Sequence, residues 1–308
     1  MELNWLEDFL ALAEHRNFSR AAEARHVTQP AFSRRIRALE DWVGTPLVVR
    51  APGGVLLNAA GEHLLERAAG LVSDLHHMRR AALKAAGREG AALTIAATHA
   101  LSFTFFPAWI RSFAPLETMG TLSLVSDTMA ACERILLAGD ADFLLCHTGA
   151  EAPASLPTEV FASIVVGADL LVPLSAPDAV GAPRWTLPGR PEAPCRMLAY
   201  SAASGLGRVV EAARKSGGEA LSLDAVFTAP LAATLQTMAR QGHGLAWLPR
   251  TMAEEDIAAG RLVDAGDGRH SIHVEIRLFR PKHRQSKAVE AFWKSMAAAA
   301  ALQCSRPS

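Results

Sequence analysis

The residues of this sequence best suited to chemistry lie on one side of a helix predicted over residues 28–43. Its apolar positions, at spacings of four, three and four, are Phe32, Ile36, Leu39 and Val43. The side chains that this pattern turns away from the core are Gln29, Ser33, Arg34 and Arg37. In the major groove of DNA, a Gln side chain pairs with adenine and an Arg side chain with guanine. The pattern therefore predicts a DNA-reading helix, or alternatively an ordinary helical hairpin with a solvated arginine face.

Two shorter helices are predicted before this one. Apolar residues at helical spacing over residues 3–13 predict the first, and Asn17 and Ser19 are N-cap types before a second at residues 20–24. Thr28 can cap the third helix, whose first turn tolerates Pro30 because the missing N–H would have no partner there. Short helices joined by a tight turn are typical of helix-turn-helix DNA recognition.

A hairpin is predicted after the third helix. Residues 46–50 and 55–57 read as strands on either side of the turn signal Pro52-Gly53-Gly54. Arg50 on this wing, together with Thr28 and nearby backbone N–H groups, would contact phosphates, which fix register but read no sequence.

A long helix is predicted from Asn58 to Ala86. Its apolar residues follow spacings of 4, 3, 4, 3 and 4, the 3.5-residue repeat that favours a partner helix along one seam. The residues are Leu64, Ala68, Leu71, Leu75, Met78 and Ala82. We expect Leu64, Leu71, Leu75 and Met78 to hold two chains together, the alternative being a helix packed on its own domain. Gly87-Arg88-Glu89-Gly90 then marks a linker.

Beyond Ala91 strands alternate with helices. The predicted strands are 93–98, 121–125, 142–146, 196–200, 221–227, 245–248 and 271–280. The predicted helices are 101–113, 129–138, 205–215, 231–240 and a last one carrying Val289, Phe292, Trp293 and Met296. This succession implies parallel sheets with right-handed crossovers, in two α/β halves joined by two crossings with a ligand cleft between them.

The ends of the predicted strands supply candidate effector ligands. His99 and Ser102 open a helix after one strand, and Ser201 and Ser204 do the same in the second half. Helix N-termini present free N–H donors and partial positive charge, which suits a small anion. Further hydroxyls come from Ser126, Thr128 and Thr228. The alternative is that these side chains only cap helices.

Composition limits the classes of function. The 308 residues suffice for about two domains, and Lys+Arg equals Asp+Glu at 31 each, which excludes polyanion binding by bulk charge. Residues 16–50 nevertheless carry seven arginines against three acids. No apolar run is long enough to span a membrane, the acidic opening does not read as a secretory signal, and four scattered cysteines fit a reducing cytosol. We expect a cytoplasmic protein with no cofactor and no metal site.

The sequence also lacks the motifs expected of a catalytic site. It contains neither Gly-x-Ser-x-Gly nor Gly-x-x-x-x-Gly-Lys. This argues against an enzyme and leaves sequence-specific DNA binding as one interpretation of the chain. The alternative is a two-lobed ligand-binding protein or enzyme whose helix-turn-helix is not sequence-specific.

Three stretches carry a family resemblance: residues 16–22, residues 27–40 and the pattern Gly44-x-Pro46-Leu47-x-x-Arg50. They resemble the N-terminal domain of LysR-type transcriptional regulators, and residues 242–249 resemble a segment of that family's second domain. The resemblance implies a winged helix-turn-helix at 1–59 (helix-turn-helix about 19–38), a linker helix at 58–88, and an effector domain at 91–308. That domain is expected to be periplasmic-binding-protein-like, with lobe I at about 91–163 and 269–308 and lobe II at about 164–268.

The family resemblance also assigns roles to residues and partners. It puts Thr28, Gln29, Pro30, Ser33 and Arg34 at major-groove positions and Arg50 at a wing contact. It implies a homodimer or homotetramer on dyad-symmetric double-stranded DNA, a small-molecule effector or oxidant, and contact with RNA polymerase.

Within the family, the opening residues, the complete run 29–40, residues 99–102 and residues 246–249 most resemble the hypochlorite-responsive regulators. That subgroup is associated with methionine oxidation, which makes Met129, Met197 and Met238 candidates, although Leu206 stands where a sensing Met is expected. Cys146 and Cys195 are too far apart in sequence to indicate the closely spaced pair of peroxide sensors.

Overall fold

The computed structural model describes residues 1–51, 54–86, 93–112, 121–217 and 220–304, with the side chains of Arg50 and of several α4 and α11 residues left out. It divides the chain into two compact units. The first is Met1–Glu89 with the short segments Leu137–Asp140 and Pro157–Val160, and the second is the rest of the chain. The turn signal at 52–53 and the linker at 87–90 lie outside the described residues.

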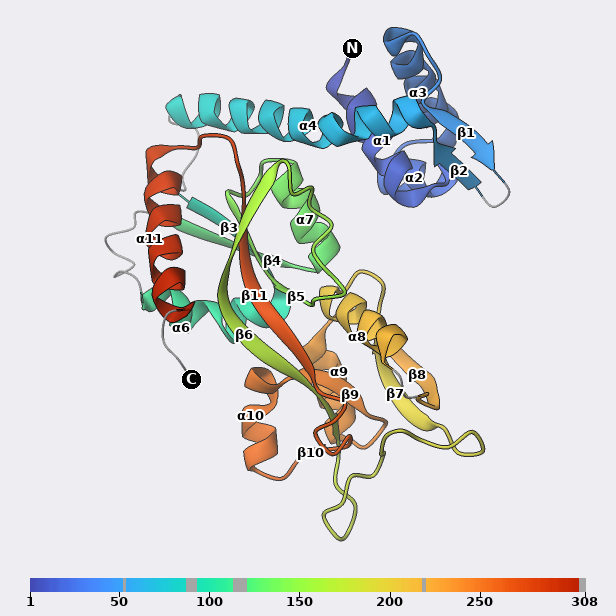
Figure 1. The fold of residues 1–308 in the computed structure, drawn as a ribbon, viewed down its shortest axis with the longest axis vertical. Coiled ribbons are helices and arrows are strands. Elements are labelled where there is room, and N and C mark those ends of the chain that lie inside the picture. Colours follow the sequence, from blue (N-terminus) through green and yellow to red (C-terminus); the bar gives the residue numbers. More distant parts are fainter. Residues whose placement is uncertain (52–53, 87–92, 113–120, 218–219, 305–308) are drawn as a thin grey trace. The chain divides into compact units, whose positions relative to one another are not determined.

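The first unit follows the predicted order of elements (Figure 1). They are α1 (Leu3–His15), α2 (Phe18–Ala24), α3 (Gln29–Val43), β1 (Val48–Ala51), β2 (Gly54–Leu57) and α4 (Ala59–Ala85). Asn17 is the N-cap of α2, because its side chain accepts hydrogen bonds from the backbone of Ser19 and Arg20. This helix therefore begins at Phe18, earlier than predicted. Thr28 occupies the N-cap position of α3, but its side chain makes no capping bond.

Helix α4 is anchored at its first turn. The Asn58 side chain accepts from the backbone N–H of Gly61 at 2.9 Å and donates to the carbonyl of Pro46 at 2.7 Å. A Cβ at position 61 would lie 2.2 Å from the carbonyl oxygen of Leu47, so only glycine fits there. The core of this unit is made by Leu6, Phe9, Leu12, Phe32, Ile36 and Leu39, with Ala68 and Val72 of α4 packed against it.

The second unit contains the remaining elements. Its strands are β3 (Leu93–Thr98), β4 (Leu122–Asp127), β5 (Phe143–Thr148), β6 (Phe161–Ser175), β7 (Cys195–Tyr200), β8 (Leu223–Ala229), β9 (Ala246–Pro249), β10 (Val263–Asp264) and β11 (Ile272–Pro281). Its helices are α5 (His99–Phe103), α6 (Phe106–Arg111), α7 (Met129–Leu137), α8 (Gly205–Ser216), α9 (Ala232–Arg240), α10 (Arg250–Ala258) and α11 (Lys287–Cys304). The predicted helix 101–113 is wrong in its described part, which forms two short helices with Pro107 near the start of the second.

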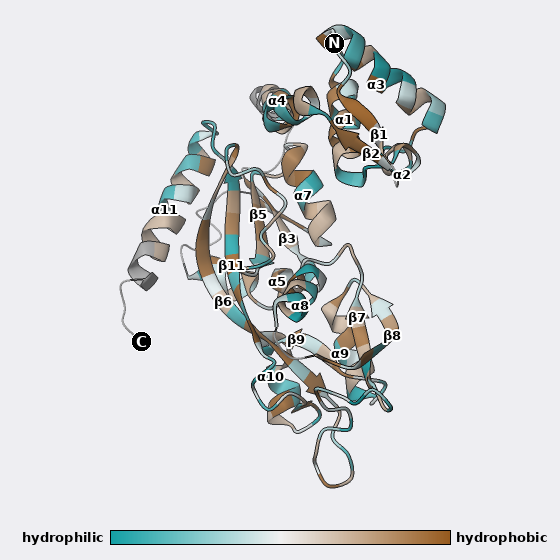
Figure 2. Cartoon of the chain, turned by 45° about the vertical axis from the view of Figure 1, so that its right-hand side comes forward, coloured by the Kyte–Doolittle hydropathy of each residue, from teal (hydrophilic) through white to brown (hydrophobic). Residues whose placement is uncertain are grey.

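The main sheet has the order β10-β6-β11-β5-β3-β4, with β9 paired to β6. Strands β3, β4 and β5 pair in parallel, as do β7 and β8 in a separate sheet. The predicted parallel pairing is confirmed for these strands, whereas β11 lies between β5 and β6 and runs antiparallel to both. Figure 2 shows the alternation of hydrophobic and hydrophilic residues along β11, as its sequence predicts.

Strand β6, which the sequence analysis did not predict, joins the two halves of this unit. It pairs with β11 from Phe161 to Leu171, with one register shift between Ile276 and Arg277 (Figure 1). One half, lobe I, holds β3, β4, β5, α5, α6, α7 and α11 around a core that includes Phe143, Trp109 and Phe292. The other, lobe II, holds β7–β10, α8, α9 and α10 around a core that includes Leu235, Leu245 and Trp247.

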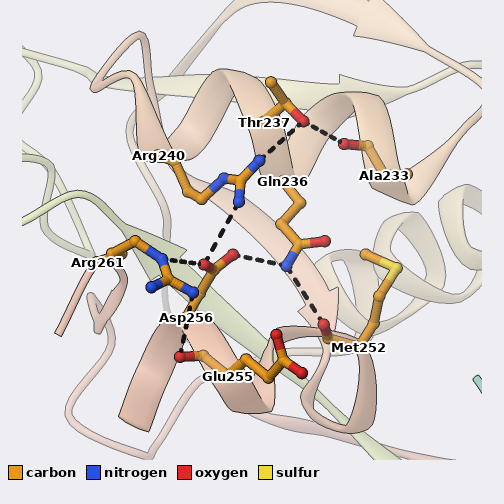
Figure 3. A network of polar contacts seen from close by, with 8 residues as sticks. All are labelled: Ala233, Gln236, Thr237, Arg240, Met252, Glu255, Asp256 and Arg261. Atoms are coloured by element: carbon orange, nitrogen blue, oxygen red, sulfur yellow. Dashed lines mark hydrogen bonds and ion pairs between the residues drawn. The ribbon is translucent and has the colours of Figure 1, made fainter. Parts of the chain in front are cut away.

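A buried carboxylate links α9 to α10 in lobe II (Figure 3). Asp256 accepts from Gln236 at 2.7 Å and forms ion pairs with Arg240 and Arg261. Burial alone would raise the pKa of Asp256, but the hydrogen bonds from Arg261 and Gln236 outweigh it and lower the pKa below its ordinary value. The carboxylate is therefore kept charged, and it joins two helices that share no backbone hydrogen bonds.

Candidate functional site

Helix α3 presents the predicted DNA-reading side chains to solvent. Thr28, Gln29, Pro30 and Arg34 are exposed and Ser33 is half-buried, while Phe32, Ile36 and Leu39 are buried. The Gln29 amide donates to the Ser33 hydroxyl at 3.1 Å, which aligns two polar side chains one helical turn apart. Gly44, with φ of +86°, ends the helix in the left-handed conformation that glycine adopts without strain. The exposed face therefore carries amide, hydroxyl and guanidinium groups, which are donors of the kind that contact bases in a major groove.

A network of charged side chains fixes α3 against its neighbours. Asp8 of α1 is fully buried, and its two carboxylate oxygens bind Arg25 at 2.8 Å and Arg35 at 3.3 Å. Glu7 binds Arg25 and also the ring Nε2 of His76 on α4, at 2.8 Å. His76 of α4 therefore contacts α1 through Glu7. Removal of Asp8 would leave two arginines without their buried partner, so this network holds the reading helix at a fixed angle.

The wing is a two-stranded antiparallel ladder. Arg50 of β1 pairs with Val55 of β2, and the backbone N–H of Val55 also bonds to the carbonyl of Arg16. The position of the Arg50 side chain lies outside what the structure describes, so its predicted phosphate contact stays a prediction.

The seam predicted along α4 divides into two parts. Leu64 and Ala68 pack against the core of the first unit, so these positions follow the alternative interpretation of a helix packed on its own domain. Leu71, Leu75 and Met78 remain 48%, 38% and 64% exposed. Three apolar side chains at spacings of four and three thus form one exposed stripe, which we call the α4 stripe.

A cavity lies between the two lobes of the second unit. Its volume is about 30 Å³, and about 10–15 Å³ suffices for one water molecule, so it suits a small ligand. The residues around it are Thr98, His99, Ala100, Asp127, Thr128, Met129, His147, Ser204, Gly205, Leu206, Pro230, Leu231 and Ala232. Three of the contributing segments are the N-termini of α7, α8 and α9. We call this cavity the cleft.

The structure brings some of the predicted effector residues to the cleft. His99, Thr128 and Ser204 line it, whereas Ser102, Ser126, Ser201 and Thr228 do not. Ser204 also caps α8, and the Thr128 hydroxyl accepts from Ala131 at 3.4 Å, so both act as helix caps. His99, Ser102 and Ser126 form a hydrogen-bonded cluster at the edge of the cleft, with Ser126 3.0 Å from the His99 ring and 2.8 Å from Ser102.

Two residues of the cleft were missed by the sequence analysis. The Thr98 hydroxyl and the His147 Nε2 are buried and have no hydrogen-bond partner among the described residues. Burial lowers the pKa of His147, although Asp169 with its carboxylate 4.0 Å away opposes this, so the ring is neutral at pH 7. Thr98 ends one predicted strand and His147 directly follows another, so the strand-end rule used for His99 would have found both.

Sulfur atoms lie in buried positions of this unit. Met129 is 2% exposed and lines the cleft, with Sδ 3.6 Å from the position that a Cβ on Gly205 would take. Cys132, Cys146 and Cys195 are free and buried. Burial raises the pKa of the Cys132 thiol to about 12 and that of Cys195 to about 11, and it raises the pKa of Cys146 as well. These three thiols are therefore poor nucleophiles at neutral pH.

Within the described residues, no group of three or more His, Cys, Asp or Glu side chains could hold a metal ion. The same part of the chain contains no helix that is long and apolar enough to cross a membrane.

Comparison with known families gives two matches that together cover most of the chain. Residues 3–62 match the bacterial regulatory helix-turn-helix protein model of the lysR family, and residues 86–301 match the LysR substrate binding domain. The Escherichia coli K12 HTH-type transcriptional regulator YjiE is 32% identical over 306 residues, which are 96% of this chain and 94% of that protein.

Solved structures resemble the whole chain as well. Vibrio fischeri DarR in complex with DNA is 30% identical, with a TM-score of 0.55 and coverage of 96% of this chain and 98% of that one. Full-length HypT from Salmonella typhimurium, a hypochlorite-specific LysR-type transcriptional regulator, is 29% identical, with a TM-score of 0.58 and coverage of 98% and 99%. The HypT regulatory domain has also been solved with bromide bound; it is 26% identical, with a TM-score of 0.56 and coverage of 70% and 97%.

Proposed function

The chain belongs to the LysR family of DNA-binding transcriptional regulators, and from this premise we propose that it responds to a small anion held in the cleft. It has a C-terminal effector-binding domain and is not an enzyme. The single observation that carries the proposal is the meeting of two unpartnered polar atoms, Thr98 Oγ1 and His147 Nε2, with three helix N-termini around one small cavity.

An anion in this position would meet several complementary groups. The first-turn N–H groups of α7, α8 and α9 have no acceptors within their own helices, and the helix dipoles place partial positive charge there. The Thr98 hydroxyl and the neutral His147 ring can each donate one further hydrogen bond. Two carboxylates oppose an anion. Asp127 lines the cleft and accepts from the backbone N–H of Thr128 at 2.6 Å, and the Asp169 carboxylate lies 4.0 Å from His147 Nε2. Their charges limit affinity for an anion, which suits a reversible signal.

Bromide is a suitable probe, because it is small and monovalent and its anomalous scattering locates it in a crystal. We expect a bromide peak in the cleft of the full chain, and binding that weakens about 10-fold or more in Thr98→Val and His147→Gln. Asp127→Asn should bind bromide more tightly, since it removes a like charge. A cleft without bromide at any concentration up to 1 M, or an Asp127→Asn variant that binds more weakly, would overturn the anion proposal in favour of a neutral or cationic effector.

A second candidate signal is an oxidant, and the chain would then group with the hypochlorite-responsive regulators. The supporting observations are the likeness to HypT and the place of Met129, which is one of the residues that line the cleft. Hypochlorous acid transfers its oxygen to the thioether, releasing chloride and a proton, and the resulting sulfoxide is polar. In this narrow cavity the added oxygen would push against Gly205 and the start of α8.

Met129→Leu separates the two signals. If the oxidant is sensed here, this variant loses the transcriptional response to hypochlorite while its bromide affinity is unchanged, and intact-mass analysis of the wild type shows one added oxygen that the variant lacks. Met238→Leu is the matched control, because Met238 packs only against the lobe II core. A full response in Met129→Leu would remove the oxidant role of Met129 and leave the anion proposal intact.

We propose further that the regulator is a homodimer or homotetramer on dyad-symmetric DNA. The α4 stripe supports this, because three exposed apolar side chains at coiled-coil spacing favour a second helix. Contact with RNA polymerase and a cytoplasmic location belong to the same proposal, since a regulator of transcription acts where the template and the polymerase are. Size-exclusion chromatography with light scattering, with and without operator DNA, tests the oligomeric state.

A further inference from the structure

Lobe II contains a second cavity that shares no lining residue with the cleft. It is bounded by the C-terminal part of α8, by β9 and by the start of β11, and its volume is about 260 Å³. Leu221, Trp247 and Ile272 form an apolar wall, and Arg214 and Arg269 bring two guanidinium groups to the same space. We propose that this cavity binds a small organic carboxylate, with the apolar body against Trp247 and the carboxylate on Arg214.

Arg214 carries the argument, because its hydrogen bonds are incomplete. Its Nε is buried and has no partner among the described residues. Its Nη1 lies 3.8 Å from the thioether of Met197, a weak acceptor, and 3.4 Å from the Glu211 carboxylate one turn earlier on the same helix. A guanidinium has five donors in a planar fork, and a carboxylate matches that fork with two parallel bonds. A ligand carboxylate would supply the acceptor that the protein does not, once the guanidinium turns its Nε edge to the cavity.

Arg269 strengthens the positive potential at the opening. Its partner Asp267 is 3.8 Å away and both side chains are exposed, so water screens this pair and the guanidinium stays available. An organic ligand is favoured over an inorganic ion, because its apolar part would remove the apolar wall of the cavity from water. An ion alone would leave that wall in contact with water. Trp247 is held rigidly in this wall by a hydrogen bond from its Nε1 to the carbonyl of His270, at 2.9 Å.

The size of the cavity limits the ligand. Drug-sized molecules occupy pockets of roughly 300–1,000 Å³, so 260 Å³ fits a single ring or a short branched chain. The recognised class is thus a monocarboxylate with one compact apolar group. Such a site is independent of the cleft, and the two can be tested separately.

Cyclohexanecarboxylate is the probe, and cyclohexanecarboxamide is its neutral counterpart of the same shape. Titration calorimetry on the full chain should show the carboxylate binding and the amide binding at least about 10-fold more weakly. Arg214→Met should lose about 10- to 100-fold in carboxylate affinity, and Arg214→Lys should restore only part, because an ammonium cannot form the two-bond fork. Arg269→Gln should lose less than Arg214→Met.

Two controls make the experiment decisive. Arg134→Gln removes an exposed arginine of lobe I and should leave affinity unchanged, and His147→Gln alters the cleft alone and should do the same. Circular dichroism of every variant establishes that it is folded. Equal binding of carboxylate and amide, undiminished affinity in a folded Arg214→Met, or a loss in His147→Gln comparable to that in Arg214→Met would each overturn the second site. Only the last of these would point back to the cleft.

Discussion

Arg208 of α8 and Glu133 of α7 form an ion pair of 3.0 Å that joins lobe II to lobe I beside the cleft. Both partners also bind the same third residue: Arg208 donates to the Ser155 hydroxyl at 2.7 Å, and the Ser155 backbone N–H donates to Glu133 at 2.8 Å. The backbone N–H of Ala130 bonds to the carbonyl of Ala203 at 3.4 Å nearby. These contacts join the two lobes and form only while the lobes stay together.

We predict that Arg208→Met shifts the balance between open and closed lobes more than it changes stability. Because Arg208 is partly exposed, its loss should lower the free energy of unfolding by only about 1 kcal/mol. An effector that binds the closed form would then bind more weakly, with a loss of binding free energy that is also about 1 kcal/mol. Hydrogen exchange at Ala130 and urea unfolding measure the two effects. Exchange that is unchanged while stability falls by several kcal/mol would contradict a role in closure.

The buried His147 predicts a dependence of stability on pH. Burial lowers its pKa in the folded protein below the ordinary value of 6.5, so the unfolded chain binds a proton that the folded chain does not. The contribution of the neutral His147 ring to the free energy of unfolding is fully present above pH 6.5. It is lost as pH falls below that value, and the loss is about 1–2 kcal/mol at pH 5. His147→Gln should reduce the dependence of the unfolding free energy on pH in this range. The measurement is the difference in unfolding free energy between pH 8 and pH 5. An identical difference in both proteins would disprove the assignment.

Substitutions of Arg34 and Arg50 should impair DNA binding in different ways. Arg34 is exposed on the reading face of α3, so Arg34→Ala should cost about 1–3 kcal/mol on the cognate site and relax preference at one position of each half-site. Arg50→Ala should weaken binding to cognate and random DNA alike. It should also lower the slope of the logarithm of affinity against the logarithm of salt concentration by about one per subunit. Fluorescence anisotropy at several salt concentrations distinguishes them. Equal loss of discrimination in both variants would reject the two roles.

The α4 stripe predicts the effect of a charge at its first position. Leu71→Asp should leave the folded first unit intact, because Leu71 is about half exposed in the single chain. In a paired seam the same carboxylate would be buried without a partner, at a cost of several kcal/mol. Sedimentation of the complex with a palindromic duplex should therefore show loss of the two-chain species. His63→Asp, at an exposed position off the stripe, is the matched control, and an equal effect of both would argue against the seam.

Asp256 predicts a loss of stability. Asp256→Ala would remove the carboxylate shared by Arg240, Arg261 and Gln236. Because the two arginines are 41% and 50% exposed, water can solvate them, and we expect a loss of about 1–3 kcal/mol. Thermal unfolding of the full chain reports it. Asp256→Asn should cost less, since it keeps the hydrogen bond from Gln236 by presenting its amide oxygen.

The elements of the first unit were predictable because their signals are local. The stripe of α3, the cap at Asn17 and the turn after Ala51 each involve residues within a few positions of one another. Strand β6 has no such signal. Residues 162–170 are mostly half-buried and residues 171–175 are all buried, so the alternation expected of a strand is absent. Gly167, Asp169 and Pro173 interrupt its apolar residues further.

The sequence predicted that a ligand cleft lies between two α/β halves, but it indicated only some of the residues that line it. Strand ends and helix starts indicated His99, Thr128 and Ser204, which line it. His147 directly follows the predicted strand 142–146, so the same rule could have indicated it, but in the structure it lies within a strand that is buried along its whole length. Its neighbours at the N-termini of α8 and α9 are far along the chain, and a single sequence does not show which distant segments meet.

The place of β11 in the sheet has a consequence for the order in which the protein is made. This strand lies between β5 and β6, so lobe I lacks a central strand until residues 272–281 have left the ribosome. The first unit, by contrast, draws almost all its residues from the first 89. A growing chain, or one cut short by a nonsense codon after residue 89, can thus hold a nearly complete DNA-reading unit without a finished sensing unit. Such a fragment would compete for operators while receiving no signal.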